Sequence, residues 1–200
     1  MRIFEESMRK NRAMIETYLQ KYFRIPSEEI AQVASLFREE KLQKGDFFVK
    51  KGRQCRKLGF LLEGYLRFYF TTETKEITHW IFWQGHLVTD VSSFYLQTPS
   101  KWHVQALTDC HLYTINYDDY QKINQFVPSW GQINQTFIVK CFSGLENRIF
   151  TFLSMSAEER YQYLFDAHKE LFQYIPLNYL ASMLGITPET LSRIRKKRIS

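Results

Sequence analysis

The chain has 200 residues, of which 44% are hydrophobic and 16% aromatic, and its formal net charge is +6. This hydrophobic content excludes a disordered protein, and the length is enough for one large domain or two small ones. The first twenty residues are too charged for a signal peptide and no apolar run reaches membrane-spanning length, so we expect a cytoplasmic protein with no membrane partner.

Two helices are predicted before any strand. Residues 4–20 have the apolar spacing of an amphipathic helix. A second helix should begin after Pro26, with Ser27 as its cap. Its expected buried positions are Ile30, Val33, Ala34 and Phe37.

From about residue 40 to residue 116 the hydrophobic period is two, which indicates strands. In one such stretch, Leu66, Phe68 and Phe70 alternate with Arg67 and Tyr69. Turn-forming residues separate the strands at Lys44-Gly45-Asp46, Lys51-Gly52, Glu63-Gly64, Glu73-Thr74 and Gln84-Gly85. Short strands at near-regular spacing predict a small antiparallel roll or barrel. We therefore expect an α+β fold in which residues 1–122 form a β-roll sensor domain with N-terminal helices.

A long helix should follow, within residues 123–155, with Pro128 near its start. Apolar residues recur there every three or four positions, at Ile133, Phe137, Cys141, Leu145, Ile149 and Phe152, and the stripe is widened by Ile138 and Phe142. So broad an apolar face needs cover on more than one side. Either the rest of the chain covers it completely, or a second copy of the same helix covers part of it and the segment is a dimerisation helix.

A new helical module is predicted from Ser156 to the end of the chain, because Ser156 and Glu159 have the spacing of a capping box. Further on, Gly185 suits a tight turn after one helix, Thr187 can cap the next helix, and Pro188 fits its first turn. Small Ala181 suits a close helix crossing, and Ile186 should fill the gap between the helices. The expected buried seam is Leu180, Leu184, Leu191 and Ile194. Residues 156–200 are therefore predicted to be a helix-turn-helix DNA-binding domain.

The opposite face of the second helix is polar and basic. Residues 187–200 hold five Lys or Arg and one Glu, which gives +4 of the net +6. In a major groove, Arg193 could pair with guanine and Glu189 with cytosine, while Arg195 and its basic neighbours up to Arg198 would meet phosphates. The full set expected to contact DNA is Thr187, Pro188, Glu189, Thr190, Ser192, Arg193, Arg195, Lys196 and Lys197. The alternative is a helical hairpin with a solvated basic end.

This order of elements resembles the Crp/Fnr superfamily of bacterial transcription regulators. Three segments resemble its C-terminal domain: Ala157-Glu158-Glu159-Arg160-Tyr161, Ile175-Pro176 and the segment from Leu184 to Arg195. The stretch Phe60-Leu61-Leu62-Glu63-Gly64, the Lys44-Gly45-Asp46 turn, Gly52 and Gly64 resemble its sensor domain. It implies a homodimer that binds a near-palindromic duplex site, with RNA polymerase as a further candidate partner. The superfamily's base-reading positions fall on Glu189 and Arg193, but Pro188 replaces the arginine that starts its recognition helix.

The sensor departs from the cyclic-nucleotide binders of that superfamily. Their glycine–glutamate pair and later arginine, which hold the phosphate, correspond here to Thr89, Asp90 and Ser100. Neighbouring Lys101 could substitute for the arginine, although strand alternation points it the other way. The resemblance therefore implies a degenerate pocket at Thr89, Asp90, Ser100 and Lys101, with no cyclic-nucleotide cofactor.

Cysteine and histidine residues offer few metal sites. The three cysteines, Cys55, Cys110 and Cys141, are scattered and are expected to be reduced, mostly buried thiols without a metal. For haem, Cys55 and the histidines His79, His86 and His103 remain available, although a single histidine on a strand is more often structural.

Two other function classes compete with the regulator. A cupin-like metal-dependent enzyme would need clustered ligands, which the dispersed histidines do not supply, so we expect no enzyme. A protein-interaction module could use aromatic residues of the roll such as Trp80, Trp83, Tyr95 and Trp102.

Overall fold

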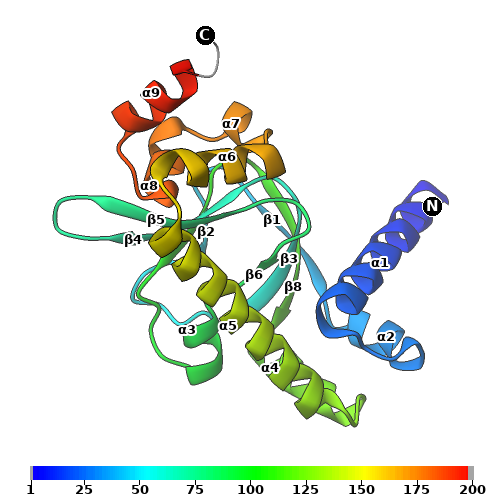
Figure 1. The fold of residues 1–200 in the computed structure, drawn as a ribbon. Coiled ribbons are helices and arrows are strands. Elements are labelled where there is room, and N and C mark those ends of the chain that lie inside the picture. Colours follow the sequence, from blue (N-terminus) through cyan, green and yellow to red (C-terminus); the bar gives the residue numbers. More distant parts are fainter. Residues whose placement is uncertain (1, 198–200) are drawn as a thin grey trace.

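Two antiparallel sheets form the centre of the protein (Figure 1). The structure is a computed structural model that describes the backbone of residues 2–197 and the side chains of residues 13–197. One sheet has the order β1-β8-β3-β6 and the other the order β2-β7-β4-β5. The strands are β1 (Arg38–Leu42), β2 (Phe47–Val49), β3 (Lys57–Glu63), β4 (Leu66–Thr71), β5 (Glu76–Phe82), β6 (Leu87–Val88), β7 (His103–Ala106) and β8 (Cys110–Asn116). The predicted α+β fold with an antiparallel roll is confirmed.

Helices precede and follow the roll, and one short helix lies between β6 and β7 (Figure 1). They are α1 (Arg2–Phe23), α2 (Ser27–Ala34), α3 (Val91–Leu96), α4 (Tyr117–Lys122), the 3₁₀ turn η1 (Ile123–Gln125), α5 (Trp130–Ser154), α6 (Ala157–Ala167), α7 (Leu171–Tyr174), α8 (Leu177–Leu184) and α9 (Pro188–Lys197). The capping box predicted at the start of α6 is present, because the Ser156 and Glu159 side chains each accept a hydrogen bond from the other's backbone N–H.

The predicted cap of α2 was wrong. The helix begins at Ser27, Pro26 occupies the cap position, and no side chain caps the helix. Pro26 has φ −53° and ψ 142°. The proline ring fixes φ near this value, and the extended ψ lets Pro26 itself lead the chain into the first turn.

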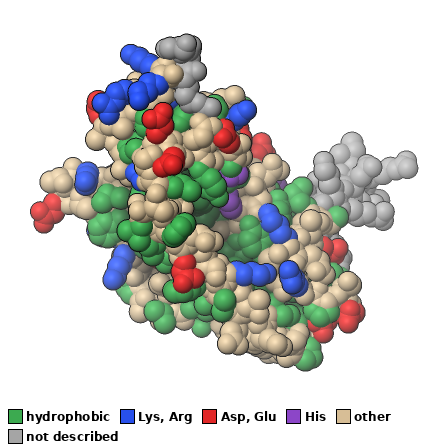
Figure 2. Space-filling model, in the orientation of Figure 1, with side chains coloured by type: hydrophobic (Ala, Val, Ile, Leu, Met, Phe, Trp, Pro, Cys, Tyr) green, Lys and Arg blue, Asp and Glu red, His purple; other side chains and the backbone are tan. Residues whose placement is uncertain are grey.

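The long helix α5 crosses the roll and is covered over only part of its length (Figure 1). In its first half, Trp130 and Phe137 are buried against Phe23 of α1, with ring centroids 5.3 and 4.9 Å from that ring. In its second half, large apolar side chains remain exposed, among them Ile149 and Leu153. Hydrophobic side chains gather around a hollow beside this part of the molecule (Figure 2). A single chain therefore leaves much of the predicted apolar stripe uncovered.

The C-terminal helices pack on the outer face of the sheet that contains β4 and β5. The backbone N–H of Thr78 in β5 donates to Ser182 Oγ of α8 over 2.9 Å. The Arg67 guanidinium lies 3.7 Å from the Tyr179 ring centroid. Arg67 and Tyr69, which alternate with apolar residues along β4, are consequently both buried.

Candidate functional site

The junction between α8 and α9 has the local geometry that the sequence predicts. Gly185 has φ +68°, and a Cβ built on it would lie 2.6 Å from Phe152 Cε1 of α5, so both the backbone angle and the space favour glycine. Thr187 Oγ1 accepts a hydrogen bond from the Thr190 backbone N–H over 3.2 Å, and Pro188 is the first residue of α9. The turn between the two helices is thus Gly185 to Thr187.

The apolar side of this helix pair is buried. Ala181, where the helices approach, has no exposed surface. Ile186 packs against the same cluster from within the turn. The predicted seam is all buried, at Leu180, Leu184, Leu191 and Ile194. This burial determines which face of α9 remains outside.

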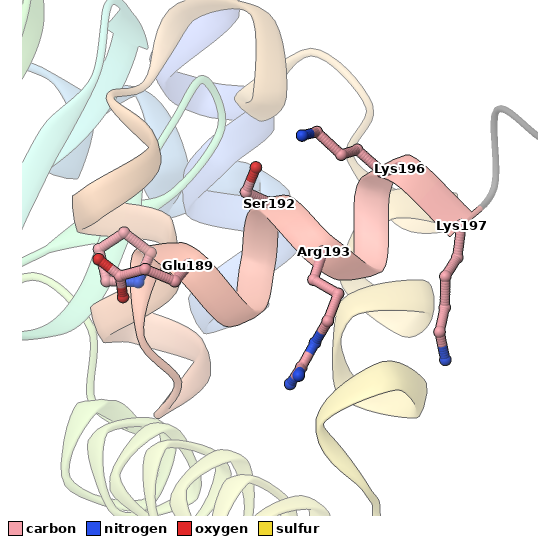
Figure 3. Close-up of a pocket in the computed structure, with 6 residues that line it drawn as sticks. Glu189, Ser192, Arg193, Lys196 and Lys197 are labelled. Carbon is pink, nitrogen blue, oxygen red and sulfur yellow. The ribbon is translucent and has the colours of Figure 1, made fainter.

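The outer face of α9 is polar, basic and open (Figure 3). It presents Pro188, Glu189, Ser192, Arg193, Lys196 and Lys197, all exposed. These side chains come from one helix and project away from it, so they form an open surface rather than an enclosed cavity (Figure 3). Among the side chains of residues 13–197, that of Arg193 takes part in no hydrogen bond or ion pair, and Lys197 Nζ lies 3.8 Å from the Glu158 carboxylate of α6.

The remaining predicted contact residues lie around this face. Thr187 is exposed, whereas Thr190 and Arg195 are partly buried. Arg198 lies outside the described residues. The pKa of Glu189 is lowered by a hydrogen bond from its own backbone N–H and another from the Thr187 side chain. The carboxylate at the start of α9 is therefore ionised at neutral pH and can accept hydrogen bonds from outside.

The second predicted site, at Thr89, Asp90 and Ser100, is buried, and each of the three side chains has a hydrogen-bond partner within the chain. Asp90 caps α3: one carboxylate oxygen accepts from the Ser93 N–H over 3.3 Å, and the other lies 2.7 Å from Ser100 Oγ. The Thr89 hydroxyl donates to the Lys57 carbonyl over 3.1 Å. Lys101 is exposed, unlike the three buried residues. The polar side chains of the cluster are thus bonded within the chain.

Of the four residues considered as haem ligands, two histidines line one cavity, whereas Cys55 and His103 do not line it. Cys55 is fully buried, and its thiol lies 3.5 Å from the Thr89 hydroxyl. His103 stacks on Tyr69 with ring centroids 4.9 Å apart. His79 and His86 lie elsewhere, in the lining of a cavity beside α5. Residues 2–197 contain no group of three or more His, Cys, Asp or Glu side chains placed to hold a metal ion.

That cavity, about 580 Å³ in volume, was not predicted. It lies between β5, α5 and the C-terminal helices, and Arg148 of α5 and Arg160 of α6 belong to its lining. One signal was present in the sequence: Arg148 sits among the apolar positions Leu145, Ile149 and Phe152 of the long helix. A cation within an apolar stripe must find a partner or water on folding.

Comparison with known proteins identifies the roll. Residues 39–125 match the family model of the cyclic nucleotide-binding domain. No curated protein matches the chain. Within residues 2–197, none of the helices combines the length and hydrophobicity that a membrane span requires.

Several solved bacterial regulators share the fold. FixK2 from Bradyrhizobium japonicum is similar with a TM-score of 0.68 and 13% identity, over 80% of this chain and 83% of that one. The c-di-GMP-responsive global regulator CLP of Xanthomonas campestris has a TM-score of 0.65 and 17% identity, over 86% and 91%. A CooA mutant from Carboxydothermus hydrogenoformans has a TM-score of 0.61 and 19% identity, over 82% and 76%. Residues 39–125 thus match the cyclic nucleotide-binding domain model, and the fold is similar to that of these three solved proteins.

Proposed function

We propose that this protein is a homodimeric, sequence-specific DNA-binding transcription regulator of the Crp/Fnr type. The observation that carries the proposal is the outer face of α9, where Arg193 is exposed and has no partner within the described residues. The turn and the buried seam make α8 and α9 a candidate helix-turn-helix, in which α9 would lie in the major groove.

The side chains of this face would have different roles. Arg193 can donate two hydrogen bonds to a guanine edge, and ionised Glu189 can accept from cytosine. Arg195, Lys196 and Lys197 lie in the last turn and would contact phosphates, which position the helix without reading sequence. The hydroxyl groups of Thr187, Thr190 and Ser192 would form hydrogen bonds with base edges or with phosphates.

A second copy of the chain would cover the exposed half of α5. The exposed large apolar residues of α5 have 37% to 82% of their surface accessible: Val139, Phe142, Leu145, Ile149, Phe150, Phe152 and Leu153. A contiguous apolar surface of this kind marks an interaction site. Pairing two α5 helices would bring two α9 helices to successive major grooves, about 34 Å apart. The proposed parts are a sensor (1–122), a dimerisation helix (123–155) and a DNA-binding domain (156–200).

We further propose that cyclic AMP does not control the protein and that the protein is not an enzyme. A cyclic phosphate in the roll would need cationic or N–H donors in a buried site. Asp90 instead supplies a carboxylate, and its oxygens are already bonded to Ser93 and Ser100. Inserting an anion there would break the cap of α3 and place two negative groups together.

The proposal is tested by selecting bound duplexes from a random pool with the full chain. We expect enrichment of a near-palindromic site whose half-sites lie about one helical turn apart. The enrichment should be the same with and without added cyclic AMP or cyclic GMP. An Arg53→Ala variant, which changes an exposed arginine of the roll, should select the same site. A pool that stays random after repeated rounds would contradict the proposal.

A further inference from the structure

Two turns beside β2 and β7 concentrate positive charge. Residues 47–57 include five Lys or Arg and no Asp or Glu, and residues 97–105 include one Lys and again no acidic residue. Arg56 and Lys57 of the first segment pair with carboxylates. The remaining four cations are exposed and form no ion pair within residues 13–197: Lys50, Lys51, Arg53 and Lys101. These four residues are called the basic patch below.

Backbone hydrogen bonds hold the two turns against each other. The Gly52 N–H donates to the Ser100 carbonyl over 2.8 Å, and the Ser100 N–H donates to the Arg53 carbonyl over 2.9 Å. The first turn closes between the Arg53 N–H and the Lys50 carbonyl over 2.9 Å, and Gly52 has φ +83°, an angle that glycine adopts at low cost. Because Lys101 follows Ser100, the backbones of Arg53 and Lys101 lie close together.

Two lysines of the patch lie over aromatic rings at the edge of the sheet. Lys51 Nζ lies 4.8 Å from the Phe70 ring centroid and donates to the Thr71 carbonyl over 3.2 Å. Lys50 Nζ lies 5.3 Å from the Phe47 ring centroid. A cation that already lies over a ring has less freedom to lose when a partner binds, so the cost of ordering it is smaller.

The neighbouring carboxylate does not neutralise these lysines. Burial lowers the pKa of His103, and Lys51 and Lys50 lower it further against an opposing effect of Glu76. The Glu76 carboxylate is paired with buried Arg67. The patch therefore keeps its positive charge, and its like charges repel one another in the free protein. An acidic partner would relieve that repulsion.

The basic patch and α9 lie at different edges of one sheet. The strand order β2-β7-β4-β5 places β2 and β5 at the two edges. The patch begins directly after β2, whereas α8 packs on β5. Neighbouring strands are about 4.8 Å apart, so the two edges are separated by about 14 Å. The patch is thus a second basic surface, separate from the outer face of α9.

We propose that the basic patch binds an acidic peptide segment of a protein partner. Arg53 would donate two parallel hydrogen bonds to one carboxylate, and the three lysines would attract others as point charges. An apolar contact is also available, because Leu96 at the end of α3 is 71% exposed. It lies beside the patch, since the carbonyl of the next residue, Gln97, accepts a hydrogen bond from the Gln54 side chain.

The aromatic rings favour a peptide over a single-stranded nucleic acid, which would need open ring faces for its bases. Lysine ammonium groups lie over Phe47 and Phe70. Trp102 packs on Phe68 and His79, with ring centroids 4.9 and 5.1 Å apart. These rings are already in contact with groups of the chain, so the affinity of the patch would come from charge.

The test measures fluorescence anisotropy of a short labelled peptide of Glu, Asp and Leu with the full-length chain, in the absence of DNA. Lys101→Glu replaces an attraction by a repulsion and should weaken binding by about tenfold or more. Lys41→Glu makes the same charge change at an exposed position of β1, in the other sheet, and should weaken binding by less than about twofold. A peptide with Gln and Asn in place of the acidic residues should not bind.

Three outcomes would overturn the proposal. Equal losses on Lys101→Glu and Lys41→Glu would show attraction to net charge alone. A loss on Arg193→Glu as large as that on Lys101→Glu would place the peptide at α9. An oligothymidylate that depends on Lys101 more strongly than the acidic peptide does would make the partner a nucleic acid. Failure of α9 to bind DNA would leave the peptide measurement unaffected, because no DNA is present.

Urea unfolding at low salt separates binding from folding. Lys101→Glu places a carboxylate beside Arg53 and removes a repulsion, so its unfolding midpoint should equal or exceed that of the wild type. A weaker peptide affinity together with an unchanged or higher midpoint supports a binding surface. A lower midpoint would assign Lys101 to the fold and contradict the proposal.

Discussion

The outer face of α9 and the buried cluster of Thr89, Asp90 and Ser100 are both polar, but they differ in where their partners lie. In the cluster, each polar side chain is bonded within the chain. On α9, Arg193 has no partner within the described residues and is open to solvent. Polar groups that satisfy one another hold a fold together, whereas exposed cations aligned on one helix face are available to an outside partner. The roll cluster therefore has a structural role, and the open face of α9 supports the proposal that this helix contacts DNA.

The largest predicted effect is a loss of stability in mild acid, which should arise inside the fold and not at α9. His79 and His86 lie inside the fold, whereas the outer face of α9 contains no histidine. Burial lowers the pKa of His79 and His86 from 6.5 to about 4. The unfolded chain binds these protons as the pH falls below about 6.5, while the folded chain takes them up only near pH 4. The stability contribution is complete above pH 6.5 and is lost toward pH 4, by at most roughly 3 kcal/mol for each histidine.

Urea unfolding at pH 7.5, 6.0 and 5.0 measures this loss. A variant with both His79→Phe and His86→Phe should lose less stability than the wild type over the same range. Both histidines lie against aromatic neighbours, which a phenyl ring can also contact. If the double variant and the wild type lost stability in parallel, the buried histidines would not be the cause.

Removing the carboxylate of the cluster should have the next largest effect. Asp90→Ala deletes the cap of α3 and removes the closer of two acceptors of the Ser100 hydroxyl, at 2.7 Å, so that only the Trp102 carbonyl at 3.0 Å remains. We expect a loss of about 2 kcal/mol in the free energy of unfolding, measured with urea. The control is Asp118→Ala, which removes an exposed carboxylate paired with Arg56 at 3.0 Å and should cost less than about 1 kcal/mol. A wild-type stability for Asp90→Ala would mean that the cluster is not structural.

The smallest predicted effect concerns the basic residues at the end of α9. Replacing Lys196 or Lys197 with alanine should weaken binding to specific and random duplexes by the same few-fold factor. Each replacement should also reduce the slope of log affinity against log salt by about 1, because a phosphate contact releases about one counterion. Anisotropy titrations at three salt concentrations give both quantities. A change confined to the specific duplex would assign these lysines to base reading.

The sequence predicted local features of the helix pair well, because each depends on neighbouring residues. Gly185, Thr187 and Pro188 have their expected positions and conformations, as does the capping box at Ser156. The apolar periods likewise predicted the roll and the long helix. The pattern also predicted buried cysteines, and Cys55 and Cys110 are buried while Cys141 is only partly so.

Features that depend on distant parts of the chain were not predicted. Burial of Arg67 follows from packing by Tyr179, more than a hundred residues later, and no strand pattern contains that information. Arg148 of α5 and Arg160 of α6 line one cavity because both pack on the Phe152 ring in the folded chain. In the sequence, Arg148 only interrupts an apolar stripe. The assignment of DNA contacts to α9 remains a prediction.

The most direct test of that assignment compares Arg193→Ala with the wild type on the selected duplex and on a random duplex, by fluorescence anisotropy. A base-reading arginine supplies about 1–3 kcal/mol of discrimination, so affinity for the selected duplex should fall at least about tenfold. Affinity for the random duplex should fall by no more than about threefold, since only one charge is lost. Equal losses on both duplexes would contradict base recognition by α9.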